Sequence, residues 1–237
     1  MDYGPATYGD RWADVYDQRI GAFPGEVDFL AARADGGSAL ELGVGTGRVA
    51  IPLAERDVDV VGIDASTRML DVLRSKSDRV TALVGDMADV DAPGKFDLVY
   101  VVFNTFFALL SQEAQVRCFA NVAPRLKPNG VFVIAVFVPD PSRFDMDRRV
   151  EATRVATDDA EISISSHDPV GQVVTTQHIH FSDTVELRPV RIRYAWPSEL
   201  DLMAQLAGLR LRERHEDFEG RSFTATSKSH VSVYGRG

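Results

Sequence analysis

The chain contains the stretch Leu40-Glu41-Leu42-Gly43-Val44-Gly45-Thr46-Gly47-Arg48, a glycine-rich turn between an expected strand and an expected helix. Glycines let a backbone pass close to a ligand, because they carry no side chain. The next apolar run, residues 58–63, is followed by Asp64. A carboxylate about 20 residues after such a turn is typical of a group that binds ribose hydroxyls. The stretch therefore predicts a unit that binds an adenosine-containing ligand.

The spacing of the glycines distinguishes between two classes of ligand. A dinucleotide site has the pattern G-x-G-x-x-G, in which the start of the helix receives a pyrophosphate. Here the third position of that pattern is the bulky Arg48, and Gly47 comes one place early. The resulting G-x-G-x-G, with Glu41 two places before it, resembles motif I of the class I methyltransferases that use S-adenosylmethionine (SAM).

The resemblance extends over residues 39–138. Within it, residues 61–64 resemble motif II, 85–87 motif III, 96–106 motif IV and 126–132 motif V. It implies SAM as the cofactor, S-adenosylhomocysteine as its product and a small-molecule acceptor. The β-rich segment that follows resembles the small-molecule branch, which includes amino-sugar N-methyltransferases of bacterial natural-product pathways.

Strand and helix patterns alternate from residue 39, which is typical of a parallel sheet with helices on both faces. Strands are expected at 39–42, 58–63, 80–84, 96–103, 131–138, 209–214 and 229–234, and helices at 47–55, 67–74 and 111–126. A turn is expected at 127–130, and Ser198 and Gly208 are expected to bound a last helix. The predicted fold class is α/β, a doubly wound, mostly parallel seven-strand sheet. The resemblance implies that its last strand is antiparallel.

Two segments stand outside this alternation. The first, residues 1–35, is expected to be a helical lid, because aromatic and apolar side chains recur on one helical face, at Tyr8, Trp12, Tyr16 and Ile20. The second, residues 141–194, predicts an antiparallel β insertion with strands at 161–167, 173–181 and 185–194. The resemblance to the small-molecule branch implies that the insertion covers the acceptor or forms a homodimer contact. The SAM-binding domain then comprises residues 36–140 and 195–237.

The composition is that of an ordinary soluble globular protein. Its 237 residues are 45% hydrophobic and 26% charged, and the net charge is −9. The negative charge disfavours a nucleic-acid partner, because phosphates are neutralised by clustered lysines and arginines. No stretch approaches about 18 continuous apolar residues, so no membrane span is expected. The N-terminus does not read as a signal peptide, and the single Cys118, expected in the core, fits a cytoplasmic location.

Glycines and polar residues follow four successive strands, at the ends where an open parallel sheet binds its ligands. Asp64 is expected to accept hydrogen bonds from the ribose hydroxyls and Asp86 from the adenine amine, while Met87 contacts the ring. The expected cofactor-binding residues are Tyr8, Glu41, Gly43, Gly45, Gly47, Arg48, Asp64, Ala65, Met69, Gly85, Asp86, Met87, Phe103 and Asn104.

Methyl transfer from a sulfonium is an in-line displacement, so the protein mainly aligns the reacting groups. An oxygen acceptor needs a general base, whereas an amine of near-neutral pKa needs only a weak proton acceptor. The candidate catalytic residues are His178, His180 and Tyr16. The segment 104–107 lacks the prolines typical of methyltransferases that act on DNA or RNA bases. No acidic cluster predicts a metal site.

Two alternatives explain the same glycine turn differently. An NAD(P)-dependent oxidoreductase would need a small residue in place of Arg48. A SAM-fold protein without methyl transfer would be an aminopropyl transferase or a regulatory SAM-binding module. Asn104 stands where an aminopropyl transferase favours an acid, which argues against that activity.

Overall fold

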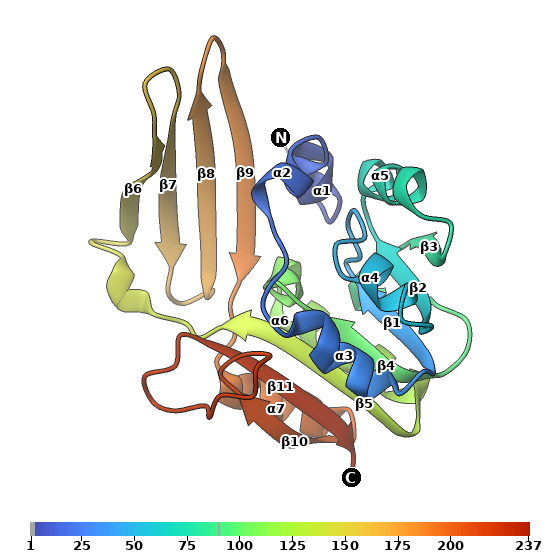
Figure 1. The fold of residues 1–237 in the computed structure, drawn as a ribbon. Helices are drawn as coiled ribbons and strands as arrows, with labels where there is room; N and C mark the ends of the chain where they lie inside the picture. Colours follow the sequence, from blue (N-terminus) through green and yellow to red (C-terminus); the bar gives the residue numbers. More distant parts are fainter. Residues whose placement is uncertain (1–2, 90) are drawn as a thin grey trace.

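The computed structural model describes residues 3–89 and 91–237, so residues 1–2 of the expected lid lie outside the described part. A seven-stranded sheet with the order β10-β11-β5-β4-β1-β2-β3 forms its centre (Figure 1). Strand β11 runs antiparallel to both of its neighbours, and the other pairs are parallel, which confirms the predicted fold class. The strands are β1 (Ser38–Leu42), β2 (Asp59–Asp64), β3 (Val80–Val84), β4 (Phe96–Val101), β5 (Leu126–Phe137), β10 (Leu209–His215) and β11 (Ser229–Arg236).

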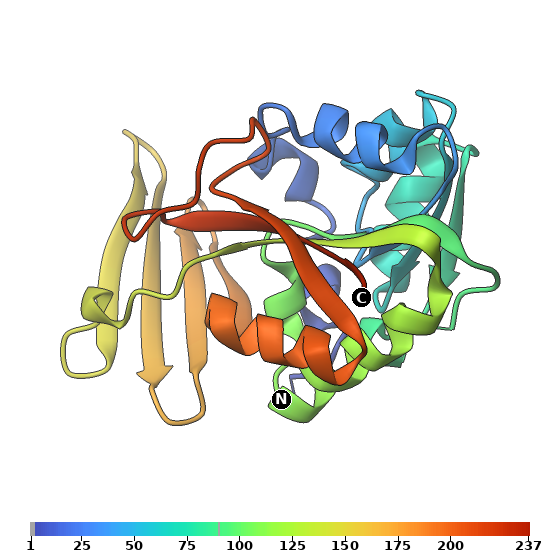
Figure 2. The ribbon, with the colours of Figure 1, turned by 90° about the horizontal axis from the view of Figure 1, so that it is seen from below.

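Helices cover both faces of this sheet, as Figure 2 shows. In β4, Val99 and Val101 belong to the core under α6 and α7, whereas Leu98 belongs to the core under α3, α4 and α5. Successive side chains of a strand point to opposite faces, so this apolar run is buried on both. The helices are α3 (Glu26–Ala34), α4 (Ala50–Ala54), α5 (Thr67–Lys76), α6 (Gln112–Val122) and α7 (Pro197–Leu206), with short 3-10 helices η1 (Met87–Asp89), η2 (Thr105–Ala108), η3 (Ala123–Arg125) and η4 (Pro141–Arg143). None of the helices in the described residues is long and apolar enough to cross a membrane.

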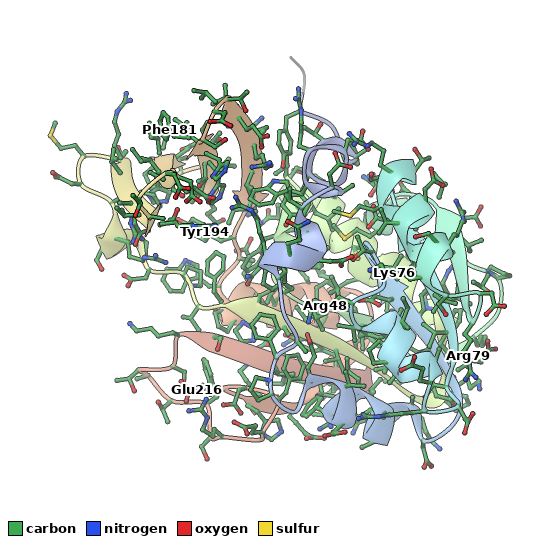
Figure 3. The ribbon with its side chains drawn as sticks, turned by 45° about the horizontal axis from the view of Figure 1, so that its top comes forward. Arg48, Lys76, Arg79, Phe181, Tyr194 and Glu216 are labelled. Carbon is green, nitrogen blue, oxygen red and sulfur yellow. The ribbon has the colours of Figure 1, made fainter. Side chains whose placement is uncertain are left out.

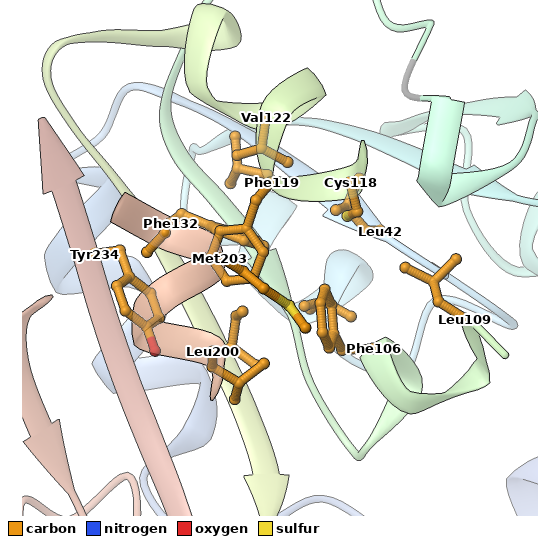
Figure 4. Close-up of a cluster of buried hydrophobic side chains, with 14 of the residues drawn as sticks. Leu42, Phe106, Leu109, Cys118, Phe119, Val122, Phe132, Leu200, Met203 and Tyr234 are labelled. Atoms are coloured by element: carbon orange, nitrogen blue, oxygen red, sulfur yellow. The ribbon is translucent and has the colours of Figure 1, made fainter. Parts of the chain in front are cut away.

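The core under α6 and α7 is built on aromatic contacts (Figure 4). The ring of Phe119 meets Phe132 and Tyr234 edge-on, with centroid distances of 5.3 and 5.6 Å. Edge-on pairs of this kind add roughly 0.5–1.5 kcal/mol beyond the burial of their surface. Cys118 lies fully buried beside them, as expected, and burial raises the pKa of its thiol. This cysteine is therefore a packing residue.

Several element boundaries differ from the predicted ones. Helix α4 begins at Ala50 because Gly47 has a φ of +83°, which a right-handed helix does not accept. Helix α7 begins at Pro197, directly after Trp196, and no side chain caps it, so the predicted cap at Ser198 was wrong. The expected turn at 127–130 lies within β5, where the pairing with β4 shifts register.

The insertion forms a separate four-stranded antiparallel sheet with the order β6-β7-β8-β9, called the small sheet below (Figure 1). Its strands are β6 (Arg148–Val155), β7 (Ala160–Asp168), β8 (Val173–Phe181) and β9 (Val185–Arg193). The prediction of three strands missed β6. This edge strand is polar and mostly exposed, with Val150 at 70% exposure, so it lacks a clear apolar alternation.

The N-terminal segment lies between the small sheet and α5 (Figure 1). This segment, residues 3–25, contains α1 (Thr7–Trp12) and α2 (Tyr16–Arg19). A Cβ at Gly9 would lie 2.4 Å from the Cβ of Ser66, so only glycine allows this close approach to the start of α5. Ser66 also donates a hydrogen bond to Asp10 at 2.7 Å. On its other side the segment contacts the small sheet, where the ring centroids of Trp12 and His178 lie 5.3 Å apart.

Candidate active site

A cavity of about 660 Å³ lies beyond the carboxyl ends of β1–β4, under the N-terminal segment and β9. The strand order reverses between β1 and β4, which is where an open α/β sheet binds its ligand. The cavity brings together most of the predicted site residues: Tyr8, Tyr16, Gly43, Gly45, Asp64, Ala65, Met69, Gly85, Asp86, Met87, Phe103, Asn104 and His178.

Two glycines of the turn shape the cavity wall. Gly43 and Gly45 have φ values of +72° and +56°, in the left-handed region that favours glycine. A Cβ at Gly43 would lie 2.3 Å from Cγ2 of Thr105, whereas a Cβ at Gly45 would meet nothing within 4 Å. Gly43 is therefore required for packing, and Gly45 leaves open space beside the backbone.

Asp64 connects the glycine turn to the end of β2. Its carboxylate accepts hydrogen bonds from the backbone N–H groups of Gly45 at 2.9 Å and Ser66 at 2.8 Å. Burial raises the pKa of this carboxyl, and the amide hydrogen bonds oppose that shift. A carboxylate has about four acceptor positions, so Asp64 can hold the turn and still bind two hydroxyl groups.

The ends of β3 and β4 supply the remaining polar groups. Asp86 accepts a hydrogen bond from the N–H of Ala88 at 2.8 Å, which fixes its carboxylate at the start of η1. Phe103 and Asn104 both have positive φ values, 54° and 63°. Asn104 is held there by the N–H of Phe137, which donates to its side-chain oxygen at 2.7 Å. Such backbone strain persists only where neighbouring contacts impose it, and it often occurs at functional sites.

Three predicted cofactor residues do not line the cavity. Glu41 points to the core face of β1, where the hydroxyl of Tyr100 donates to it at 2.9 Å, and burial raises its pKa to about 8. Gly47 packs against Ile51 and turns the chain into α4. The spacing in the sequence predicted that Glu41 shares one site with the glycine turn. Side chains of a strand alternate between its two faces, and Glu41 lies on the face where it meets Tyr100, away from the cavity.

Arg48, the third of these residues, lies near the middle of the view in Figure 3, and its side chain is 10% exposed. Its guanidinium pairs with the carboxylate of Glu26 on α3, with one contact at 3.1 Å, and Glu26 is 1% exposed. It also lies 5.2 Å from the ring centroid of Phe23 and 5.6 Å from that of Phe103. Arg48 therefore anchors the N-terminal segment to the glycine turn from behind the cavity.

His178 and Tyr16 reach the cavity, but His180 does not. Nδ1 of His178 lies 3.0 Å from the hydroxyl of Ser163 and 3.5 Å from the carboxylate of Glu161. Burial lowers the pKa of His178, and the nearby Glu161 carboxylate opposes the shift. Burial raises the pKa of Tyr16 to about 12, so its hydroxyl keeps its proton at neutral pH.

Sequence reasoning missed Glu161, which also pairs with Arg19 of the N-terminal segment. It lies 6% exposed on β7 and connects the segment to His178. Packing of the N-terminal segment against the small sheet brings these groups together, so no local pattern could have identified Glu161. Tyr3 was missed for the same reason, although its hydroxyl accepts a hydrogen bond from the N–H of Arg191 at the cavity wall.

Comparisons with known proteins agree with this geometry. Residues 39–130 match the family described as methyltransferase domain. Cypemycin N-terminal methyltransferase from a Streptomyces species is 30% identical over 98% of this chain and 98% of its own length. The chain belongs to the class I SAM-dependent methyltransferases. This confirms the predicted enzyme class and argues against the oxidoreductase and non-methylating alternatives.

Solved structures of other methyltransferases share this fold. The CcbJ methyltransferase from Streptomyces caelestis is 40% identical, with a TM-score of 0.94 over 99% of this chain and 100% of that chain. SAM-bound CalS10, an amino pentose methyltransferase from Micromonospora echinaspora, has a TM-score of 0.71 at 20% identity, over 95% and 96% of the two chains. At that identity the second likeness shows the fold alone.

Proposed function

We propose that this methyltransferase transfers the methyl group of SAM to a nitrogen atom of a small-molecule acceptor and releases S-adenosylhomocysteine. The observation that carries the proposal is one cavity with two chemically different ends. Glycines and carboxylates line the end at β1–β3, whereas aromatic rings and His178 line the end at the small sheet. The name of the cypemycin relative, an N-terminal methyltransferase, favours nitrogen over oxygen as the acceptor atom.

The residues at the first end fit SAM. The open space at Gly45 admits a ligand against the backbone. Asp64 has acceptor positions for the ribose hydroxyls, and Asp86 has them for the adenine amine, next to the apolar Met87. Bound there, SAM supplies an electrophilic methyl group on a positively charged sulfur.

Residues at the second end bind the acceptor and accept its proton. An amine that is protonated at neutral pH must lose a proton before it can attack, and His178 is the group that accepts it. The contacts of Glu161 and Ser163 at Nδ1 favour the tautomer that leaves Nε2 as the acceptor. Tyr16 donates a hydrogen bond, and Trp12 helps to exclude water. Positioning of this kind lowers the activation barrier by about 7–11 kcal/mol.

Replacing His178 by Gln is expected to lower kcat by about 100-fold, because the proton acceptor is lost. In the unmodified enzyme, kcat/KM should fall as the pH drops through the lowered pKa of His178, below its ordinary 6.5. Glu161→Gln should move this acidic limb to lower pH, because the Glu161 carboxylate raises the pKa whereas Arg19 and Arg188 lower it. Steady-state kinetics against pH measure both effects. His180→Gln is the matched control, and an equal loss of kcat in it would contradict the role of His178.

The choice of nitrogen is tested with SAM that carries a ¹³C-labelled methyl group. The enzyme is incubated with an amino sugar, a serine-containing dipeptide with a free amino terminus, and their N-acetylated forms, which keep the hydroxyl groups. We expect N-methyl signals and equimolar S-adenosylhomocysteine from the free amines only. O-methyl signals from the N-acetylated forms would show that oxygen is the acceptor.

The outer face of the small sheet supports a homodimer as a second part of the proposal. Register places Ala152, Ile162, Ile179 and Leu187 in one row across its four strands. Leu187 is 55% exposed, and a contiguous apolar face of this kind favours association. Leu187→Arg is therefore expected to convert a dimer to a monomer in light scattering, while Arg212→Ala on the distant β10 leaves it dimeric. A wild-type monomer would contradict this part.

A cytoplasmic location and the exclusion of nucleic acids stay predictions. The first rests on the single buried cysteine, and the second on the net charge of −9.

A further inference from the structure

A second cavity, of about 600 Å³, lies between the inner face of the small sheet and the chain that leaves β5. It shares Phe137, His178 and Ile192 with the first cavity, so the two meet at the proposed proton acceptor. We propose that this second cavity binds the part of the acceptor remote from the methylated atom, and that this part is neutral and rich in hydroxyl groups. The inference rests on the proposed function, because it takes the two cavities to share one acceptor.

Hydroxyl side chains form a row on the wall of the second cavity. Strand register pairs Ser165 of β7 with Thr176 of β8, and their side-chain oxygens lie 2.9 Å apart. Ser163, one pleat along β7, contacts His178, and Thr153 lies on the neighbouring β6. A hydroxyl can donate and accept by rotating, so the row complements hydroxyl groups of a ligand in either direction.

Aromatic rings line the same cavity. The ring of Phe144 stacks on His167 with a centroid distance of 4.6 Å, and Nε2 of His167 lies 2.9 Å from the hydroxyl of Tyr194. Because His167 and Tyr194 satisfy each other, they present mainly their ring surfaces. Ring surfaces pack against C–H groups, so this wall suits a carbon skeleton whose hydroxyls reach the serines and threonines.

The charges on the wall argue for a neutral ligand. Arg149 is paired with Glu151 at 2.6 Å. At Asp140, a hydrogen bond from Ser142 lowers the pKa of the carboxyl, and the charge of Lys228 acts in the same direction. Together with Arg143, the wall carries three cations and two carboxylates, so most of its charge is compensated, and the remaining exposed cation would add little affinity for a phosphate or carboxylate on the acceptor.

The test uses two secondary amines with the same carbon skeleton, N-methyl-D-glucamine and N-methylhexylamine, of which only the first carries hydroxyls. Affinities are measured by ligand-observed NMR on protein saturated with S-adenosylhomocysteine. We expect N-methyl-D-glucamine to bind about tenfold more tightly, as for one or two added net hydrogen bonds. Ser165→Trp should fill the cavity and abolish this preference. Ser166→Trp, on the next residue and the exposed opposite face, should keep it.

Thr176→Val tests the same point without a bulky side chain, because it removes one hydroxyl at constant shape, and it should reduce the preference about threefold. Equal affinity for both amines in the unmodified protein, or a preference that survives Ser165→Trp, would overturn the inference. A protein that binds S-adenosylhomocysteine but shows no preference refutes this inference alone. A protein that fails to bind S-adenosylhomocysteine refutes the proposed function instead.

Discussion

Asp64→Asn is expected to weaken the binding of S-adenosylhomocysteine by about 100- to 1,000-fold. The carboxylate serves two purposes, since it accepts the N–H groups of Gly45 and Ser66 and has further acceptor positions at the cavity. This range corresponds to about 3–4 kcal/mol, and hydrogen bonds to a charged group contribute about 1.5–3 kcal/mol each, so losing one to two of them at the ribose accounts for it. An amide also turns N–H donors toward backbone N–H donors, which loosens the turn. Calorimetric titration measures the loss.

Asp59→Asn is the matched control for this experiment. Asp59 begins the same strand, β2, and its side chain is exposed. The control should bind S-adenosylhomocysteine like the unmodified protein. If Asp64→Asn keeps its affinity within about threefold while it remains folded, the carboxylate does not bind the ribose and the cofactor does not lie across β1 and β2.

Arg48→Ala is expected to lower the free energy of unfolding by about 3–5 kcal/mol, because it leaves a buried carboxylate without its partner. Glu26 is 1% exposed, and its bidentate pairing with Arg48 is the salt bridge that holds α3 to the glycine turn. The N-terminal segment should loosen with it, since Arg48 also lies against Phe23 and Phe103. Urea denaturation followed by circular dichroism measures the change.

Two further variants separate burial from charge. Arg68 pairs with Asp14 at the surface, where both side chains are more than half exposed, so Arg68→Ala should cost at most about 1 kcal/mol. The double variant Arg48→Met with Glu26→Gln removes both charges and should recover most of the stability. A cost below about 1 kcal/mol for Arg48→Ala would mean that water reaches Glu26 and that the anchor is not buried in solution.

Patterns in the sequence identified the strand-end residues that line the first cavity, but they did not identify what the small sheet contributes to it. The residues after β1, β2, β3 and β4 meet because carboxyl ends of parallel strands share one edge, and local patterns identify those ends. His178 was one of two equal candidates, two residues apart on one strand face. Only the packing of the N-terminal segment against the small sheet separated it from His180.

The sequence by itself determined the α/β class and the place of the glycine turn, and its resemblance to the family implied the seven-strand sheet. These follow from local periodicity and from backbone conformations that only glycine adopts readily. The tertiary structure alone decided that Glu41 and Arg48 lie behind the cavity, that Glu161 reaches both Arg19 and His178, and that a second cavity adjoins the first. Such contacts join residues far apart in the chain, and their geometry depends on strand register and side-chain packing, which no local pattern encodes.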